Sequence, residues 1–290
     1  MPILFTITRS GNDFSCRTDT DPSFFVGRRV PYENNIGLYN IFSGSRLQKL
    51  NYDSHDFTGA FGFWATFIEP TAICEGQNFL TLNTYDRAAF TFGFGQFAAH
   101  VPNGDFVQYF RTMLALPEAG DYFPNLSLAG GRISKTGSTA APVPLESDAT
   151  TKPLMDYLNP DLNEVQDAEV IAAAKLIHWT SRFVSARNAQ VEQMVATFRD
   201  FMTRANKRVG IDGRPANQCC VIADILHQGR GGQMTWPLID AALKTSKPFD
   251  ALLRIGLPKW EGRTTKLRNA INARADFQTK RWSAAHGDFV

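Results

Sequence analysis

Two acidic residues and a threonine lie close together in the stretch "CEGQNFLTLNTYDRAAFTFGFGQF", in an order that suits hydrolysis of a glycosidic bond. Glu75 follows an apolar run, Asp86 lies in a short polar segment 11 positions later, and Thr91 begins a glycine-containing run. Hydrolysis needs a protonated carboxylic acid that donates to the leaving oxygen and, with inversion, a second carboxylate that activates water. This order makes Glu75 the candidate acid and Asp86 the candidate base.

The expected surroundings of the two carboxyl groups fit these roles. Partial burial keeps a catalytic acid neutral, whereas polar and solvated surroundings keep a catalytic base ionised. Glu75 comes after an apolar helix and directly follows Ile73 and Cys74. Asp86 precedes Arg87 in a segment that we expect to be an exposed turn.

The segment that follows Asp86 supplies candidate substrate contacts. Thr91 is positioned to hold the attacking water, and Gly93 and Gly95 leave room for a sugar ring to approach the backbone. Gln96 is a candidate hydrogen-bonding partner of the substrate, although strand alternation directs it away from the Thr91 face. Tyr85, the residue before Asp86, completes the candidate substrate-binding set.

Two local elements must position these residues. The run "FTGAFGFWATFIEPTAICEG" predicts a helix that is interrupted at Pro70 and closed by Gly76, so that Glu75 lies at its C-terminal end. The runs "NFLTLNT" and "FTFGFGQF" flank "YDRAA" and predict a β-hairpin. On its second strand, alternation places Phe92 and Phe94 on one face and Thr91 and Gly93 on the other.

The wider sequence predicts an α+β protein. Short β-like runs with Gly, Asn, Asp and Pro fill the first part, a helix is expected within 98–117, and helical patterns dominate after residue 160. The Gly-, Ser-, Thr- and Pro-rich region between these helices predicts either a long excursion or a short hairpin with a mobile loop. We expect an N-terminal extension or accessory β/loop region over residues 1–55 and a catalytic domain over residues 56–290. The catalytic domain comprises a catalytic lobe (56–117), a loop excursion (118–160) and a helical lobe (161–290).

These motifs resemble the catalytic signature of the lysozyme-like glycosidases, above all the bacteriophage-type lysozymes. Glu-Gly after a helix, then Tyr-Asp, then Thr-Phe-Gly-Phe-Gly-Gln, is similar to that family's order of Glu-Gly, Tyr-x-Asp and Thr-[Ile/Phe]-Gly-x-Gly-[His/Gln]. The resemblance covers Glu75 to Gln96. The chain departs from it where Asp86 follows Tyr85 directly and where Gln96 replaces the more familiar histidine.

The resemblance implies a two-lobed lysozyme-like fold with the substrate groove between a small mixed lobe and a larger helical lobe. It implies a muramidase that cleaves peptidoglycan glycan strands with inversion and without metal or organic cofactor. Glu75 is then the general acid, Asp86 the water-activating or charge-stabilising carboxylate, and Thr91 its polar neighbour. Chitosanases share the superfamily, so a chitosanase-like glycosidase is the alternative, beside a non-catalytic glycan-binding or structural protein on this scaffold.

Composition and charge limit the classes of partner that the sequence suggests. The chain has 290 residues with 30 basic against 28 acidic side chains, a balance that favours neither nucleic acid nor a membrane surface as partner. The sequence contains no run of about 18 apolar residues, so no membrane-spanning helix is expected. The four cysteines lack the spacing of a disulfide scaffold or zinc site, so we expect reduced thiols.

The amino terminus lacks the features of a secretory signal. We therefore expect synthesis in the cytoplasm and action on the cell wall after lysis, injection or phage delivery. A phage lytic enzyme and an antibacterial effector both fit. An effector would add an immunity protein or a delivery-machine component to the partners.

Other residues offer competing readings. Glu69, before Pro70, is the rival for the acid role, although it lacks a hairpin partner at the family spacing. His227 follows Cys220 and Asp224 on one helix, which raises a Cys-His pair or a metal site against a simpler structural role. His178 is expected to pack, with a cleft role as alternative. The basic segment 259–281 is either a solvated face or an attractant for an anionic polymer or membrane.

Overall fold

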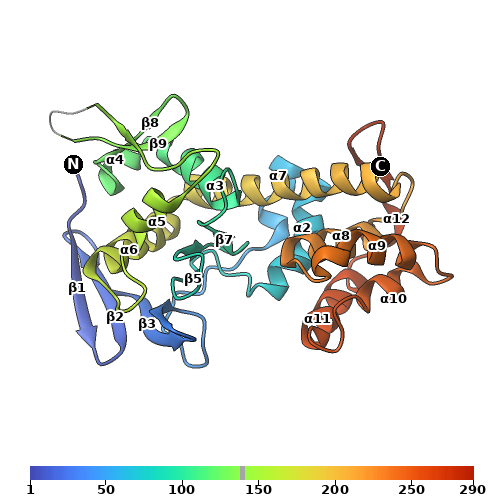
Figure 1. Cartoon of the computed structure of the whole chain (residues 1–290), viewed down its shortest axis with the longest axis horizontal. Helices are drawn as coiled ribbons and strands as arrows, with labels where there is room; N and C mark the ends of the chain where they lie inside the picture. The colour runs from blue at the N-terminus through green and yellow to red at the C-terminus, as the bar shows by residue number, and fades with distance from the viewer. Residues whose placement is uncertain (138–140) are drawn as a thin grey trace. The chain divides into compact units, whose positions relative to one another are not determined.

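The computed structural model describes residues 1–137 and 141–290, which form two compact units (Figure 1). Unit 1 comprises Met1–Asn51 and Asn78–Gln193, and unit 2 comprises Tyr52–Gln77 and Met194–Val290. This division differs from the predicted one, because each unit is assembled from two separate stretches of chain. Within these described ranges, no helix combines the length and the apolar character needed to cross a membrane.

Unit 1 is built on an antiparallel sheet whose seven strands follow one another in chain order. Its strands are β1 (Phe5–Ser10), β2 (Asp13–Thr18), β3 (Phe24–Tyr32), β4 (Asn35–Tyr39), β5 (Leu82–Asn83), β6 (Thr91–Phe92) and β7 (Phe97–Ala98). The strands expected near the N-terminus are confirmed. They are not a separate layer, because β4 pairs with β5 and so joins the hairpin that carries Asp86 to the same sheet.

The predicted hairpin forms, but its second strand is shorter than expected. β5 and β6 pair antiparallel, with Asn83 opposite Thr91. The chain then turns, and β7 returns alongside β6. Gly93 with φ +89° and Gln96 with φ +53° lie in the left-handed region, which an extended strand cannot contain. The prediction of one continuous strand through "FTFGFGQF" is therefore wrong, and so are its alternating faces beyond Phe92.

The remaining elements of unit 1 are helices and a second sheet. They are α3 (Asp105–Leu114), α4 (Ala119–Tyr122), β8 (Leu126–Ala129), β9 (Arg132–Lys135), β10 (Val143–Pro144), α5 (Lys152–Leu158), α6 (Asp167–Arg182) and the first part of α7 (Val184–Val209). The helix expected within 98–117 is confirmed by α3. Of the two readings of 118–160, the hairpin is found as β8–β9, within a three-stranded sheet of order β10-β9-β8. Residues 138–140 of that region lie outside the described residues.

Helix α6 covers the N-terminal strands and forms much of the unit 1 core, and Figure 1 draws it beside β1 and β2. Val170, Ala173 and Ile177 recur at three- and four-residue spacing and are buried. The same helix also buries Glu169 and His178. His178 is held between the Tyr122 hydroxyl at 2.8 Å and the Asp21 carboxylate at 3.1 Å, a structural setting that agrees with the packing role expected for it.

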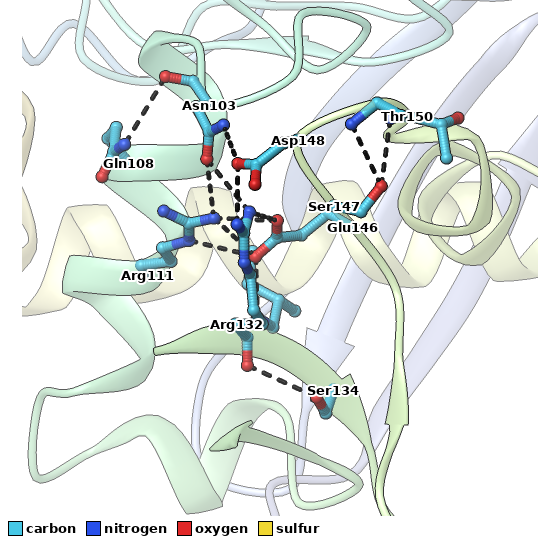
Figure 2. Close-up of polar contacts among 11 residues, drawn as sticks. Asn103, Gln108, Arg111, Arg132, Ser134, Glu146, Ser147, Asp148 and Thr150 are labelled. Atoms are coloured by element: carbon cyan, nitrogen blue, oxygen red, sulfur yellow. Dashed lines mark hydrogen bonds and ion pairs between the residues drawn. The ribbon is translucent and has the colours of Figure 1, made fainter. Parts of the chain in front are cut away.

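A charged cluster ties α3 to the second sheet of unit 1. Figure 2 shows Arg111 from α3 and Arg132 from β9 converging on Glu146. The closest guanidinium nitrogens lie 2.8 Å and 3.1 Å from Glu146 Oε2, and the Ile133 N–H donates to Oε1 at 3.0 Å. Burial raises the pKa of Glu146, but the Ile133 N–H and the two guanidinium groups outweigh it and hold that pKa below its usual range.

Unit 2 is mainly helical. Its helices and strands are α1 (Thr58–Phe61), α2 (Phe63–Cys74), the part of α7 from Met194, α8 (Ala216–Gln228), α9 (Thr235–Leu243), α10 (Pro248–Leu253), α11 (Glu261–Asn272), α12 (Asp276–Thr279), β11 (Trp282–Ser283) and β12 (Asp288–Phe289). Short 3₁₀ helices span Ser54–Asp56 and Gly232–Met234. The helices predicted after residue 160 are confirmed in both units.

Helix α2 is the central element of unit 2, packed against α8 and α11. Trp64 and Phe67 each contact Phe289 of the C-terminal hairpin, with ring centroids 5.3 Å and 4.5 Å apart. The expected interruption at Pro70 is wrong: the break between α1 and α2 falls at Gly62, where φ is +56°, and Pro70 lies inside α2. The tight aromatic packing around α2 offsets what proline costs a helix interior.

Glu146 offers a test of the charged cluster in Figure 2. We expect Glu146→Gln to lower the free energy of unfolding by about 3 kcal/mol, because it leaves two guanidinium groups without their buried counter-charge. Chemical denaturation monitored by circular dichroism measures this loss. Asp148→Asn is the matched control: its side chain pairs with Arg132 but is 79% exposed, so a loss below about 1 kcal/mol is expected. Equal losses would contradict the assigned role of Glu146.

Candidate active site

Glu75 lies where the sequence places it, at the C-terminal end of α2. It caps the helix, and its backbone N–H donates to the carbonyls of Thr71 and Ala72. The chain leaves the helix through Gly76, whose φ of +94° suits glycine. The Glu75 side chain is 17% exposed, so it is largely packed yet open to solvent at one part.

The Glu75 carboxylate is held by an arginine from a distant part of the sequence. Arg263, on α11, places its Nη1 2.7 Å from Glu75 Oε1. The same guanidinium donates to Asp224 from Nη2 at 2.7 Å and from Nε at 3.2 Å. Asp224 therefore fixes the plane of Arg263, and Arg263 in turn fixes one oxygen of Glu75. Oε2 of Glu75 accepts no hydrogen bond from the residues that the structure describes.

Asp224 is the fully buried centre of this group. It lies on α8 with no exposed surface and also pairs with the buried Arg230. Burial raises the pKa of Asp224, but its hydrogen bond from Arg263 and the charges of both guanidinium groups outweigh burial and keep the carboxyl ionised. Burial likewise lowers the pKa of Arg263, which Asp224 and Glu75 raise well above its ordinary value.

His227 and Cys220 do not form the pair considered from the sequence. The Nε2 atom of His227 lies 3.7 Å from Glu75 Oε1, and its ring packs 5.8 Å from that of Phe198. The thiol of Cys220 is buried and directed to the Phe67 carbonyl at 3.6 Å. All four cysteines are free thiols. His227 thus borders Glu75.

Glu69, the rival for the acid role, is committed elsewhere in unit 2. Its side chain on α2 is ion-paired with Arg274, and its Oε1 accepts the Ser54 N–H at 3.1 Å. Both oxygens of Glu69 therefore have partners, whereas, among the described residues, only Oε1 of Glu75 is paired. Glu69 therefore has a structural role: it holds the segment that precedes α1 against α2.

In unit 1, Asp86 occupies the turn between β5 and β6. Its Oδ1 accepts the Ala88 N–H at 2.9 Å, which stabilises the turn. Tyr85 is packed among other tyrosines, with its ring 5.0 Å from that of Tyr32 and 5.9 Å from that of Tyr39. Burial, together with Tyr39 and Asp86, raises the pKa of Tyr85 to about 12, so its hydroxyl remains a hydrogen-bond donor.

Thr91 and Gln96 come closer together than strand alternation suggests. Thr91 is buried opposite Asn83, and the Asn83 amide donates to Gln96 Oε1 at 3.2 Å. Gln96 reaches the cross-strand neighbour of Thr91 because it ends a turn instead of continuing a strand. The expectation that it points away from the Thr91 face is therefore wrong. Asn83 is a polar member of this group that sequence reasoning missed.

Gly93 is closely covered. Gln190, from α7, accepts the Phe94 N–H at 3.1 Å and donates to the Phe79 carbonyl at 3.1 Å. A Cβ atom added at Gly93 would lie 2.5 Å from Gln190 Oε1. Gly95 is buried as well. The glycines therefore let a turn pack beneath a glutamine side chain, and the prediction of bare backbone open to a sugar ring is wrong at Gly93.

The two units thus supply different parts of the predicted set. Unit 2 contains Glu75 with Arg263, Asp224 and His227, and unit 1 contains the other candidates: Tyr85, Asp86, Thr91, Gly93, Gly95 and Gln96. The contact of Arg263 with Glu75 was missed, because no sequence pattern near Glu75 indicates a partner so far along the chain. The signal for it is Asp224, an acid within the otherwise apolar run "CCVIADIL", since a buried charge requires a partner.

Among the described residues, no group of three His, Cys, Asp or Glu side chains is placed to hold a metal ion. Comparisons of the chain with protein-family models, with curated proteins and with solved structures find no match.

Removing the charge of Asp224 tests its role beneath Glu75. We expect Asp224→Asn to lower the free energy of unfolding by about 3 to 5 kcal/mol, because the buried Arg230 would lose its counter-charge and Arg263 would keep only Glu75. Urea denaturation measures the loss. Asp240→Asn is the control, since Asp240 pairs with Lys244 one turn along an exposed helix face and should contribute about 0.5 kcal/mol. A loss below 1 kcal/mol at Asp224 would count against the assignment.

Proposed function

We propose that the protein is a glycoside hydrolase of the lysozyme-like class, with a two-lobed lysozyme-like fold. Its substrate is the peptidoglycan glycan strand, cleaved between N-acetylmuramic acid and N-acetylglucosamine. The observation that carries the proposal is the arrangement of Glu75: a largely packed carboxyl group with one oxygen held by Arg263 and the other free of hydrogen bonds from the described residues. The resemblance of the Glu75–Gln96 segment to the lysozyme signature supports it.

The held oxygen gives Glu75 the fixed geometry that a general acid needs. Arg263 is itself fixed by Asp224, so the carboxyl group cannot rotate freely and its second oxygen keeps one direction. That second oxygen carries the proton for the leaving glycosidic oxygen. Glu75 must take up this proton against the attraction of Arg263, and Arg263 stabilises the carboxylate again once the proton has departed.

Asp86 is the second carboxylate of the proposal. Its Oδ1 is occupied by the Ala88 N–H, so Oδ2 is the oxygen that accepts a proton from water. The turn is partly exposed, so water can reach this oxygen. Thr91, with Asn83 and Gln96 beside it, supplies polar groups for the water or a sugar hydroxyl. In this scheme the reaction inverts the anomeric centre and needs neither a metal nor an organic cofactor.

Delivery as a phage lytic enzyme or as an antibacterial effector is consistent with this activity. For an effector, an immunity protein that covers Glu75 would be the expected partner.

The test is release of soluble muropeptides from purified peptidoglycan, with products identified by mass spectrometry. We expect the wild type to release fragments with reducing-end muramic acid and Glu75→Gln to lose at least about 100-fold in rate, as expected for removal of a general acid. Glu69→Gln is the matched control, because it makes the same change on the same helix and also weakens a contact to arginine. It should keep the activity in proportion to the folded fraction.

Three other outcomes of this test would contradict part or all of the proposal. Loss of activity in Glu69→Gln but not in Glu75→Gln would move the acid to Glu69. Turnover of chitosan alone, run in parallel, would assign the chain to the chitosanase branch. Turnover of neither polymer, with folded protein, would reject the enzymatic proposal and favour a glycan-binding or structural role.

A further inference from the structure

Unit 1 buries a carboxyl group that has no cationic partner. Glu169 lies in the first turn of α6, and none of its surface is exposed. Its Oε1 accepts the hydroxyl proton of Thr84, while Oε2 is buried without a hydrogen bond from the described residues. No ion pair joins Glu169 to an arginine, lysine or histidine in the described part of the chain. A charge at this position would therefore be largely uncompensated.

Thr84 is tied tightly to the neighbouring strand. Its hydroxyl accepts the Leu38 N–H at 2.6 Å, and its own N–H donates to the Leu38 carbonyl at 3.0 Å. Across from it, Gly37 has no room for a side chain, since an added Cβ would lie 2.7 Å from the Thr84 backbone and hydroxyl. Thr84 therefore transmits a shift of Glu169 to the chain that follows it.

That following chain is the segment with Asp86. The Asn159 side-chain amide donates to the Thr84 carbonyl at 3.0 Å and to the Ala89 carbonyl at 2.9 Å. Asn159 thus closes the segment from residue 84 to residue 89 into a loop by bridging its ends. Glu169 holds one of these ends through the Thr84 side chain.

The charges around Glu169 favour its neutral form. Burial raises the pKa of Glu169 to about 7, against the lowering effects of the Thr84 hydroxyl and the N–H groups of Gln166 and Leu38, and Asp161 raises it further. The other acids on α6 and the loop before it are engaged at the surface, Glu164 with Arg29 and Asp167 with Arg9. Helix α6 packs against β1, β2, β3 and α5, whose titratable groups include Asp13, Asp156 and Tyr157 as well as cations. None of these cations forms an ion pair with Glu169: Arg9 pairs with Asp167, Arg28 with Asp13, Arg29 with Glu164 and Lys152 with Asp156.

We infer that Glu169 is a positioning residue for Asp86: as a neutral carboxyl it holds Thr84 and the 84–89 segment in place, and on ionisation it releases them. The inference rests on the proposed role of Asp86 in catalysis. The Thr84 hydroxyl favours an ionised Glu169, but burial outweighs it, so the ionised side chain is expected to move out of its buried site toward water, and that movement breaks the contact with Thr84. Asn159 then holds the segment alone. Activity would accordingly fall on the alkaline side while the protein remains folded.

The sign of the effect on stability agrees. The folded-state pKa of Glu169 lies above the value of 4.5 for an exposed glutamate, so its neutral form stabilises the fold at low pH. This contribution is complete below pH 4.5 and is lost as the pH rises to about 7.

The experiment compares wild type, Glu169→Gln and Glu169→Leu between pH 5 and pH 9, by peptidoglycan turnover and by hydrogen exchange of residues 84–89. Gln keeps an uncharged acceptor for Thr84, whereas Leu keeps bulk without an acceptor. We expect wild-type kcat to fall more steeply with pH than the roughly tenfold per unit that loss of the Glu75 proton alone would give, and exchange at 84–89 to rise in parallel, after correction for intrinsic rates. Glu169→Gln should keep only the fall in kcat that Glu75 causes and show no rise in exchange, and Glu169→Leu should show fast exchange and low kcat at every pH.

The matched control is Glu164→Gln, which changes an exposed, paired acid in the loop before α6 and should keep the wild-type profile. Hydrogen exchange separates the two proposals. If no variant turns over glycan but exchange at 84–89 follows the pattern above, the glycosidase proposal fails and the positioning role of Glu169 stands. If Glu169→Gln keeps the alkaline rise in exchange, or if exchange in wild type does not change with pH, the positioning role of Glu169 is rejected whatever the activity.

Discussion

The structure depends on how each buried carboxyl group is compensated. Moving a carboxylate out of water is so unfavourable that it needs guanidinium partners, or else the group takes up a proton. Asp224 has Arg230 and Arg263, and Glu146 has Arg111 and Arg132. Glu169 has a hydroxyl partner and no cation. The first two are therefore fixed anions that join distant segments, whereas the third is the group whose charge can change near neutral pH.

This difference bears on the chemistry in each unit. In unit 2, the ionised Asp224 orients Arg263, and the orientation passes to Glu75 at the end of a helix that aromatic side chains hold in place. A catalytic group on such a supported element keeps its direction better than one on a free loop. In unit 1, Asp86 is on a turn whose position depends on side-chain contacts to Thr84 and Ala89. Glu75, the proposed acid, is thus held through a buried ion pair, and Asp86, the proposed base, lies on a turn held through the uncharged partner that we infer Glu169 to be.

Local patterns predicted much of the fold. The helices after residue 160, the N-terminal strands, the β5–β6 hairpin and the place of Glu75 at the end of α2 all follow from periodicity and from glycine at turns. The errors arose where long-range packing decides. Pro70 remains within α2 because Trp64 and Phe67 are buried against the C-terminal hairpin. The run after Thr91 turns at Gly93, a position covered by Gln190 from nearly 100 residues further on.

The candidate site shows the same limit. Glu75, Asp86 and Thr91 could be named because a short segment contains them, but what holds them comes from elsewhere in the chain: Arg263 for Glu75, and Glu169 with Asn159 for the turn of Asp86. No local pattern connects these residues to their targets. A charged residue inside an apolar helix pattern, such as Asp224, does indicate that some partner exists, whereas Glu169, in the first turn of α6 close to Asp167, gives no such signal. Whether the partner is a guanidinium or a hydroxyl decides between a permanent anion and a titrating acid, and only the three-dimensional packing supplies that answer.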